Sequence, residues 1–145
     1  MSSVVHSFQK LSEEVLAAMG SGLLESDVAF NDLALRLFEF QRDHNEPYRR
    51  FCQDRGATSP TCWQEILPIP TDAFKIEGLP IFCFPDDADA SKIFLTSGTS
   101  KDQRGRHHFS DISLYEASVR HGWQAMPWPS DLTTFVLTPS PHSAP

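Results

Sequence analysis

Apolar residues recur every three or four positions along residues 4–19, and polar residues fill the positions between them. This spacing predicts an amphipathic helix whose apolar face packs into a core. The residues of that face are Val5, Phe8, Leu11, Val15, Leu16 and Met19. The Gly-Ser-Gly run at residues 20–22 predicts the end of the helix, because glycine disfavours helical backbone.

Two further helices are expected before residue 57. The first begins at Asn31, whose side chain is expected to cap the first turn while Phe30 packs on Leu35, and it continues to residue 40. The second begins at the Asn-Glu-Pro run of residues 45–47 and ends at Gly56. Its inward-facing residues are expected to be Tyr48, Phe51 and Cys52.

Proline marks a change in composition after Thr58. Short apolar runs are separated by Pro60, Pro68, Pro70, Pro80 and Pro85. Prolines at this density exclude long helices and favour turns and short strands. Strands are predicted at residues 79–84, 92–95, 106–109 and 133–137, and a helix capped by Ser110 or Asp111 is expected to continue to about Trp123.

These elements together predict a mixed α/β fold. Residues 1–57 are expected to form a helical N-terminal region, and residues 58–145 are expected to form the start of an α/β subdomain that is incomplete at its C-terminal end. A chain of 145 residues has the usual size of one domain.

Charge and composition narrow the function. The net charge of −7, without a long basic run, argues against nucleic acid binding. No segment reaches the roughly 20 apolar residues of a membrane span, and the N-terminal residues lack the apolar core of a secretion signal, so we expect a cytoplasmic protein. An odd number of cysteines without CxxC spacing disfavours a disulfide framework and a zinc site. These are Cys52, Cys62 and Cys83.

The run Thr96-Ser97-Gly98-Thr99-Ser100 carries candidate chemistry. Its backbone amides can converge on an anion, its hydroxyls can donate hydrogen bonds, and its glycine permits close approach. A basic cluster that would complement triphosphate charge follows it: Lys101, Arg104, Arg106, His107 and His108. The GxxxxGK[ST] spacing of a Walker A loop is absent. An ordinary surface turn with solvated charges is the alternative, and spacing by itself does not decide between the two.

Residues 96–105, T-S-G-T-S-K-D-Q-R-G, resemble the adenylate-forming superfamily signature [ST]-S-G-[ST]-[ST]-G-x-P-K-G without a gap. Within that superfamily the chain resembles the LuxE-type acyl-protein synthetase family, the long-chain-fatty-acid luciferin-component ligases. The segment I-P-T-D-A-F-K at residues 69–75 precedes the loop, and R-H-H at residues 106–108 and S-L-Y-E-A-S at residues 113–118 follow it in the same order. The resemblance spans about residues 67–118.

The resemblance implies that the loop wraps the β- and γ-phosphates of ATP. The residues that would hold ATP are Thr96, Ser97, Gly98, Thr99, Ser100, Arg104 and Gly105. Arg104 takes the place of the usual lysine, whereas Lys101 and Gln103 depart from the glycine and proline of the signature. The resemblance also implies Mg²⁺, a fatty or other carboxylic acid substrate, and an acyl acceptor such as a protein thiol.

The resemblance places the remaining machinery further along the chain than Pro145. That machinery consists of an aromatic-Gly-x-Thr-Glu segment, a ribose-binding aspartate, a C-terminal lysine and an acyl-accepting cysteine. We therefore expect an N-terminal fragment of an acyl-adenylate-forming ligase, inactive alone and completed by downstream sequence or a complementing chain. A non-catalytic remnant or interaction module, and an unrelated α/β domain, remain as alternatives.

Other polar and aromatic residues are expected to be structural. Thr71 is expected to cap a short helix over residues 72–74, which leaves Lys75 exposed rather than catalytic. His107 and His108 alternate on a strand, so at most one faces the loop. The cysteines are expected to fill apolar surroundings. The tryptophans are expected in the core or at its rim: Trp63, Trp123 and Trp128.

Overall fold

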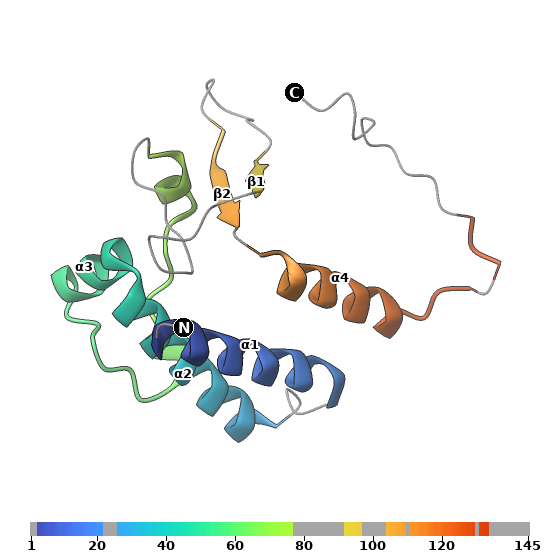
Figure 1. Cartoon of the computed structure of the whole chain (residues 1–145), viewed down its shortest axis with the longest axis horizontal. Helices are drawn as coiled ribbons and strands as arrows, with labels where there is room; N and C mark the ends of the chain where they lie inside the picture. Colours follow the sequence, from blue (N-terminus) through green and yellow to red (C-terminus); the bar gives the residue numbers. More distant parts are fainter. Residues whose placement is uncertain are drawn as a thin grey trace.

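The computed structural model describes residues 3–21, 26–76, 92–96, 104–109, 111–129 and 131–133. Within these ranges the chain is mostly helical, with four α-helices, two short 3-10 helices and one two-stranded antiparallel sheet (Figure 1). The mixed helix and strand content agrees with the predicted fold class at this coarse level. The predicted strand at residues 79–84 and most of the one at residues 133–137 lie outside the described residues.

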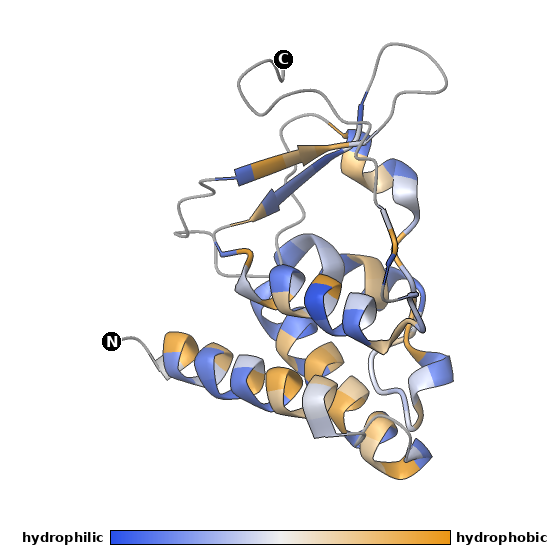
Figure 2. Ribbon diagram, turned by 90° about the vertical axis from the view of Figure 1, so that its right-hand side faces the viewer, coloured by the Kyte–Doolittle hydropathy of each residue, from blue (hydrophilic) through white to orange (hydrophobic). Residues whose placement is uncertain are grey.

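The N-terminal region is an assembly of three helices. Helix α1 spans Ser3–Ser21, helix α2 spans Asp27–His44 and helix α3 spans Glu46–Asp54. Hydrophobic and hydrophilic residues alternate around each helix (Figure 2), as the sequence periodicity requires. Helix α1 packs on α2 through Phe8 and Phe40, whose ring centroids lie 5.9 Å apart, and Glu14 forms an ion pair with Arg36 across the same contact.

Helix α2 begins four residues earlier than the sequence predicted. Its N-cap is Ser26, whose hydroxyl accepts a hydrogen bond from the Ala29 N–H at 3.4 Å. The predicted cap, Asn31, instead accepts a hydrogen bond from the Trp63 N–H at 2.8 Å. Asn31 therefore fastens the 3-10 helix η2, Trp63–Glu65, to helix α2. The prediction was wrong because a serine that can cap and an asparagine with a distant partner look equivalent in the sequence.

Helix α3 starts and stops where the sequence predicted. Asn45 is its N-cap and accepts a hydrogen bond from the Tyr48 N–H at 3.0 Å, and proline stands in its first turn. Gly56 follows the helix with φ of 65°, a conformation that favours glycine.

The core lies between helices α2 and α3 and the segment that follows them. Phe38, Tyr48 and Cys52 are buried there, and Cys52 is completely inaccessible. The partly buried residues that pack against them are Phe51, Ile66, Leu67 and Ile69. The Tyr48 hydroxyl donates a hydrogen bond to the Leu67 carbonyl at 2.9 Å. The predicted inward positions of α3 are thus confirmed.

The strand pair is a hairpin formed by β1, Lys92–Leu95, and β2, Arg106–Phe109. The strands are antiparallel, and the register pairs Leu95 with Arg106 and Phe94 with His107. Both strands have the predicted bounds. The 3-10 helix η3, Thr71–Lys75, packs against β2.

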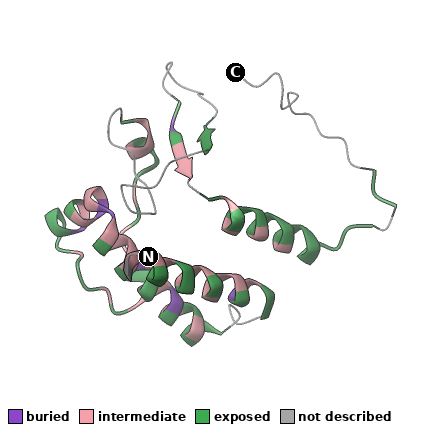
Figure 3. Cartoon of the chain, in the orientation of Figure 1, coloured by how far each residue is buried: buried purple, intermediate pink, exposed green. Residues whose placement is uncertain are grey.

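Helix α4, Ser113–Ala125, follows the hairpin and packs against α1. Its N-cap is Ile112, which makes no side-chain capping bond, rather than the predicted Asp111. Asp111 stands one residue earlier and accepts a hydrogen bond from the Ser113 N–H at 2.9 Å. Most of α4 is exposed, in contrast to the buried positions on α1, α2 and α3 (Figure 3). Within the described residues, no helix combines the length and the apolar character that crossing a membrane requires.

Candidate functional site

The hairpin brings the two ends of the candidate phosphate loop together. The Thr96 N–H donates to the Gly105 carbonyl at 2.9 Å, and the Gly105 N–H donates to Thr96 Oγ1 at 2.8 Å. These two bonds continue the strand ladder by one residue beyond Leu95 and Arg106. Thr96 and Gly105 therefore lie next to each other across the hairpin.

Gly105 permits this close approach. It is buried, and a Cβ added there would lie 3.2 Å from Thr96 Oγ1, 3.3 Å from Thr96 Cγ2 and 3.5 Å from Phe74 Cβ. The first two distances are tighter than nearly all real Cβ contacts. A larger residue at position 105 would therefore need Thr96 to move by a few tenths of an ångström. The constraint is one of space and not of backbone conformation, because the φ of Gly105 is not positive.

The Thr96 hydroxyl keeps its capacity to donate. Its oxygen accepts the Gly105 N–H, and a hydroxyl has one proton besides its acceptor lone pairs. Thr96 is exposed. It is the only member of the predicted T-S-G-T-S run that falls in the described part of the chain; residues 97–100, with Lys101 and Gln103, lie outside it.

Two cations next to the loop have no counter-charge among the described residues. Arg104 and Arg106 are exposed, and neither forms an ion pair with a residue that the structure describes. Arg104 directly precedes Gly105, and Arg106 faces Leu95 across the ladder. Exposed guanidinium groups that form no ion pair with the described residues can bind phosphate oxygens in a bidentate manner.

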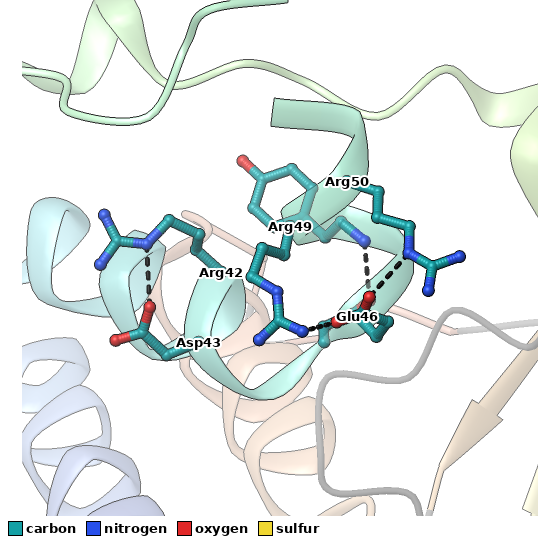
Figure 4. A network of polar contacts seen from close by, with 7 residues as sticks. Arg42, Asp43, Glu46, Arg49 and Arg50 are labelled. Atoms are coloured by element: carbon teal, nitrogen blue, oxygen red, sulfur yellow. Dashed lines mark hydrogen bonds and ion pairs between the residues drawn. The ribbon is translucent and has the colours of Figure 1, made fainter. Parts of the chain in front are cut away.

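A second arginine cluster lies at the corner between α2 and α3, and its charges are already paired (Figure 4). Arg42 bonds Asp43 at 2.9 Å and the Thr58 carbonyl at 2.8 Å. Arg49 and Arg50 both form ion pairs with Glu46, the latter at 2.7 Å. These arginines fasten the helix corner, so their charges are less available to an anion than those of Arg104 and Arg106.

The segment ahead of the loop packs directly on the strand that follows it. The ring of Phe74 in η3 stacks on the ring of His107 in β2, with centroids 4.3 Å apart and planes 29° apart. Lys75 is half-buried rather than exposed as expected, and it forms an ion pair with Asp72 at 2.8 Å. Thr71 lies inside η3 and makes no cap, because Pro70 holds the N-cap position without a side-chain hydrogen bond. The expected capping role of Thr71 was wrong.

His107 and His108 lie on opposite faces of β2, because side chains alternate along a strand. Directly opposed residues share a face, so His107 lies on the face of Phe94. Phe94 also contacts Phe109 and Tyr115, with ring centroids 5.0 and 5.3 Å away. Aromatic contacts on one face thus connect the loop hairpin to helix α4.

The structure adds a pocket that the sequence did not indicate. It has a volume of about 380 Å³ and lies where helix α2 meets η2. The residues that line it are Asp27, Val28, Asn31, Trp63 and Gln64. Trp63 is 45% exposed and lies at the rim of the core, and Trp123 and Trp128 are exposed to a similar degree. No short-range pattern links residues 27–31 to residues 63–64, which explains why the pocket was missed.

Searches for related proteins add nothing to this geometry. Comparison of the chain with protein-family models, with curated proteins and with solved structures finds no match.

Proposed function

We propose that the chain contributes the ATP-phosphate-binding part of an acyl-adenylate-forming ligase of the LuxE type. The enzyme would activate a fatty or other carboxylic acid with ATP in the cytoplasm and pass the acyl group to an acceptor such as a protein thiol. The observation that carries the proposal is the closure of the loop by Thr96 and Gly105, beside two arginines without partners among the described residues.

The arrangement suits a polyphosphate for three reasons. Thr96 and Gly105 are hydrogen-bonded to each other, and closely spaced loop ends suit a loop whose amides and hydroxyls bind an anion. Arg104 and Arg106 add positive charge in a chain whose net charge is −7. Phe74, Gly105 and His107, which belong to segments that the family resemblance selected from the sequence, also lie close to one another in space.

Magnesium is implied by ATP-dependent chemistry. The described residues contain no group of three or more His, Cys, Asp or Glu side chains that could hold a metal ion. Asp72, the carboxylate in the segment that packs on β2, is paired with Lys75. We therefore assign no residue of the described part of the chain to Mg²⁺.

Calorimetric titration of the purified chain with ATP tests the proposal. We expect the wild-type chain to bind ATP, and the double variant Gly98→Val/Thr99→Ala to lose at least tenfold in affinity, because it removes a close-approach glycine and a donor. The matched control is Gly122→Val/Thr58→Ala, which changes the same residue types at exposed positions, where an added Cβ at residue 122 meets nothing within 4 Å. Equal affinity of the loop variant and the control would contradict the phosphate-loop assignment.

The second candidate is a non-catalytic interaction module. It is favoured by the exposed apolar side chains on helix α4, where Tyr115, Val119 and Trp123 are each at least 50% exposed, since large exposed apolar patches commonly mark binding surfaces. The ATP titration separates the candidates, because an interaction module has no requirement for nucleotide. Pyrophosphate exchange that depends on an added carboxylic acid, measured with this chain alone, would exclude the non-catalytic candidate.

A further inference from the structure

The pocket between helix α2 and the 3-10 helix η2 is built from two segments that lie far apart in the sequence. Asn31 in α2 accepts a hydrogen bond from the Trp63 N–H at 2.8 Å, and the rings of Phe30 and Trp63 meet edge to face with their centroids 5.6 Å apart. These two contacts hold both the backbone and the ring of Trp63 against α2. The pocket beside them has a volume of about 380 Å³, within the range of about 300 to 1,000 Å³ that small-ligand sites occupy.

The side chains that line this pocket differ in chemistry. They include an aromatic ring, a carboxylate and an aliphatic group, supplied by Trp63, Asp27 and Val28. Trp63 is 45% exposed and Val28 is 80% exposed, so much of their apolar surface is accessible to a ligand. Asp27 is also exposed and forms no ion pair within the described residues. An indole face attracts a cation that lies within about 6 Å of the ring centroid, and aliphatic surface suits the methylene stem of an amine.

The charges around the pocket favour a cation over an anion. The N-terminal end of α2 carries roughly half a positive charge, whereas Asp27 in its first turn carries a full negative charge. Glu65, which follows the lining residue Gln64, accepts hydrogen bonds from the Thr61 N–H and hydroxyl at 2.7 and 3.0 Å. These bonds hold the pKa of the Glu65 carboxyl below its ordinary value, so it adds a second negative charge nearby. None of the described residues that line the pocket is basic.

We propose that this pocket binds a primary ammonium group on an aliphatic stem, the chemistry that a small alkylamine shares with a lysine side chain of a partner protein. The ammonium group lies beside the Asp27 carboxylate and over the Trp63 ring, and the stem lies along Val28. The pocket shares no residue with the candidate phosphate loop, so this site is independent of the proposed function.

NMR titration of the isotope-labelled chain with n-butylammonium chloride tests the proposal. The reporters are the side-chain amide signals of Asn31 and Gln64, which line the pocket. We expect saturable shifts, and binding about fivefold weaker for 1-butanol, which has a similar size but no charge, because it lacks the attraction of the cation to the ring. Titration with Nα-acetyl-lysine amide identifies the source of the ligand. Tighter binding than that of n-butylammonium indicates a lysine side chain, and weaker binding indicates a small amine.

Four variants locate the binding. Affinity for n-butylammonium should fall about fivefold in Trp63→Ala and about two- to fivefold in Asp27→Asn. Trp63→Phe keeps an aromatic ring and should lie between wild type and Trp63→Ala, which separates loss of the cation contact from loss of the fold. Asp54→Asn is the matched control, because it removes the same charge at an exposed position at the end of α3, and it should leave the affinity unchanged.

Three results would overturn the proposal. The first is the absence of saturable shifts at Asn31 and Gln64 in wild type. The second is equal affinity for 1-butanol and n-butylammonium, which would make the pocket a site for apolar stems alone. The third is an equal loss in Asp27→Asn and Asp54→Asn, which would show that the amine is attracted only by the net charge of −7.

Discussion

Replacing Gly105 by alanine probes the closure of the loop at a single atom. The added Cβ would lie 3.2 Å from Thr96 Oγ1 and 3.3 Å from Thr96 Cγ2. Both short contacts are to the Thr96 side chain. To relieve the steric overlap, either this side chain must rotate or the two strands must move apart by a few tenths of an ångström. Rotation breaks the 2.8 Å bond from the Gly105 N–H, and a lost hydrogen bond of this kind costs about 1 kcal/mol. Strand separation carries a similar overpacking cost of about 1 to 3 kcal/mol.

Gly105→Ala also lowers the conformational entropy of the unfolded chain. The same substitution at a second glycine, Gly122, measures this entropy effect without the steric contact. Alanine reduces unfolded-state freedom by about 0.5 to 1 kcal/mol at either site. Gly122 lies inside helix α4, and an added Cβ there meets nothing within 4 Å, so Gly122→Ala should stabilise the fold by about 1 kcal/mol. Gly105→Ala should instead destabilise the hairpin by about 1 kcal/mol. The two variants should thus differ by about 2 kcal/mol, or roughly 30-fold in an opening equilibrium.

Two measurements test these expectations: hydrogen exchange of the Thr96 amide reports on the hairpin, and thermal unfolding reports on the stability of each variant. The Thr96 N–H donates to the Gly105 carbonyl, so its protection reports the opening of the loop closure directly. We expect faster Thr96 exchange in Gly105→Ala than in wild type, and a higher melting temperature in Gly122→Ala. Equal Thr96 protection in wild type and Gly105→Ala would refute the steric argument.

Three further changes test the helical region by urea unfolding. Asn45→Ala removes the cap that accepts the Tyr48 N–H at 3.0 Å and should lower the free energy of unfolding by about 1 kcal/mol. Tyr48→Phe removes the hydroxyl that donates to Leu67 and should cost about 1 kcal/mol. Burial raises the pKa of Tyr48 above its ordinary value. As the pH rises above about 10, Tyr48 therefore loses its proton in the unfolded state but keeps it in the folded state. The free energy of unfolding of the wild type should fall over this range, whereas that of Tyr48→Phe should not fall for this reason. Gly56→Ala forces alanine to φ of 65° and should cost about 1 kcal/mol.

Each of these changes has its own control. Ser26→Ala removes a capping bond that is longer, at 3.4 Å, and exposed to solvent, so it should lower the free energy of unfolding less than Asn45→Ala does. An equal decrease in the two variants would contradict the argument that the buried cap at Asn45 contributes more. Parallel stability curves for wild type and Tyr48→Phe between pH 8 and pH 11 would contradict the raised pKa. Gly122→Ala controls for glycine removal, and stabilisation by Gly56→Ala would contradict the backbone argument.

Features that depend on neighbours in sequence were predictable. The N-cap at Asn45, the stop at Gly56 and the strands around the loop follow from short-range capping, turn and periodicity rules. The candidate site was also visible in part, because the T-S-G-T-S run and the arginines after it stand close together in the chain. That these residues bind ATP stays a prediction.

The sequence by itself determined helix α3 with its local caps, the hairpin strands and the residue types of the candidate loop, because these depend on contacts within a few residues or on residue type. Tertiary structure decided the partners of Asn31, Phe74 and Gly105. Asn31 binds an amide 32 residues away, and Phe74 stacks on a histidine 33 positions later in the chain. Such contacts depend on how whole elements pack, and no local pattern encodes the distance at which Thr96 and Gly105 meet.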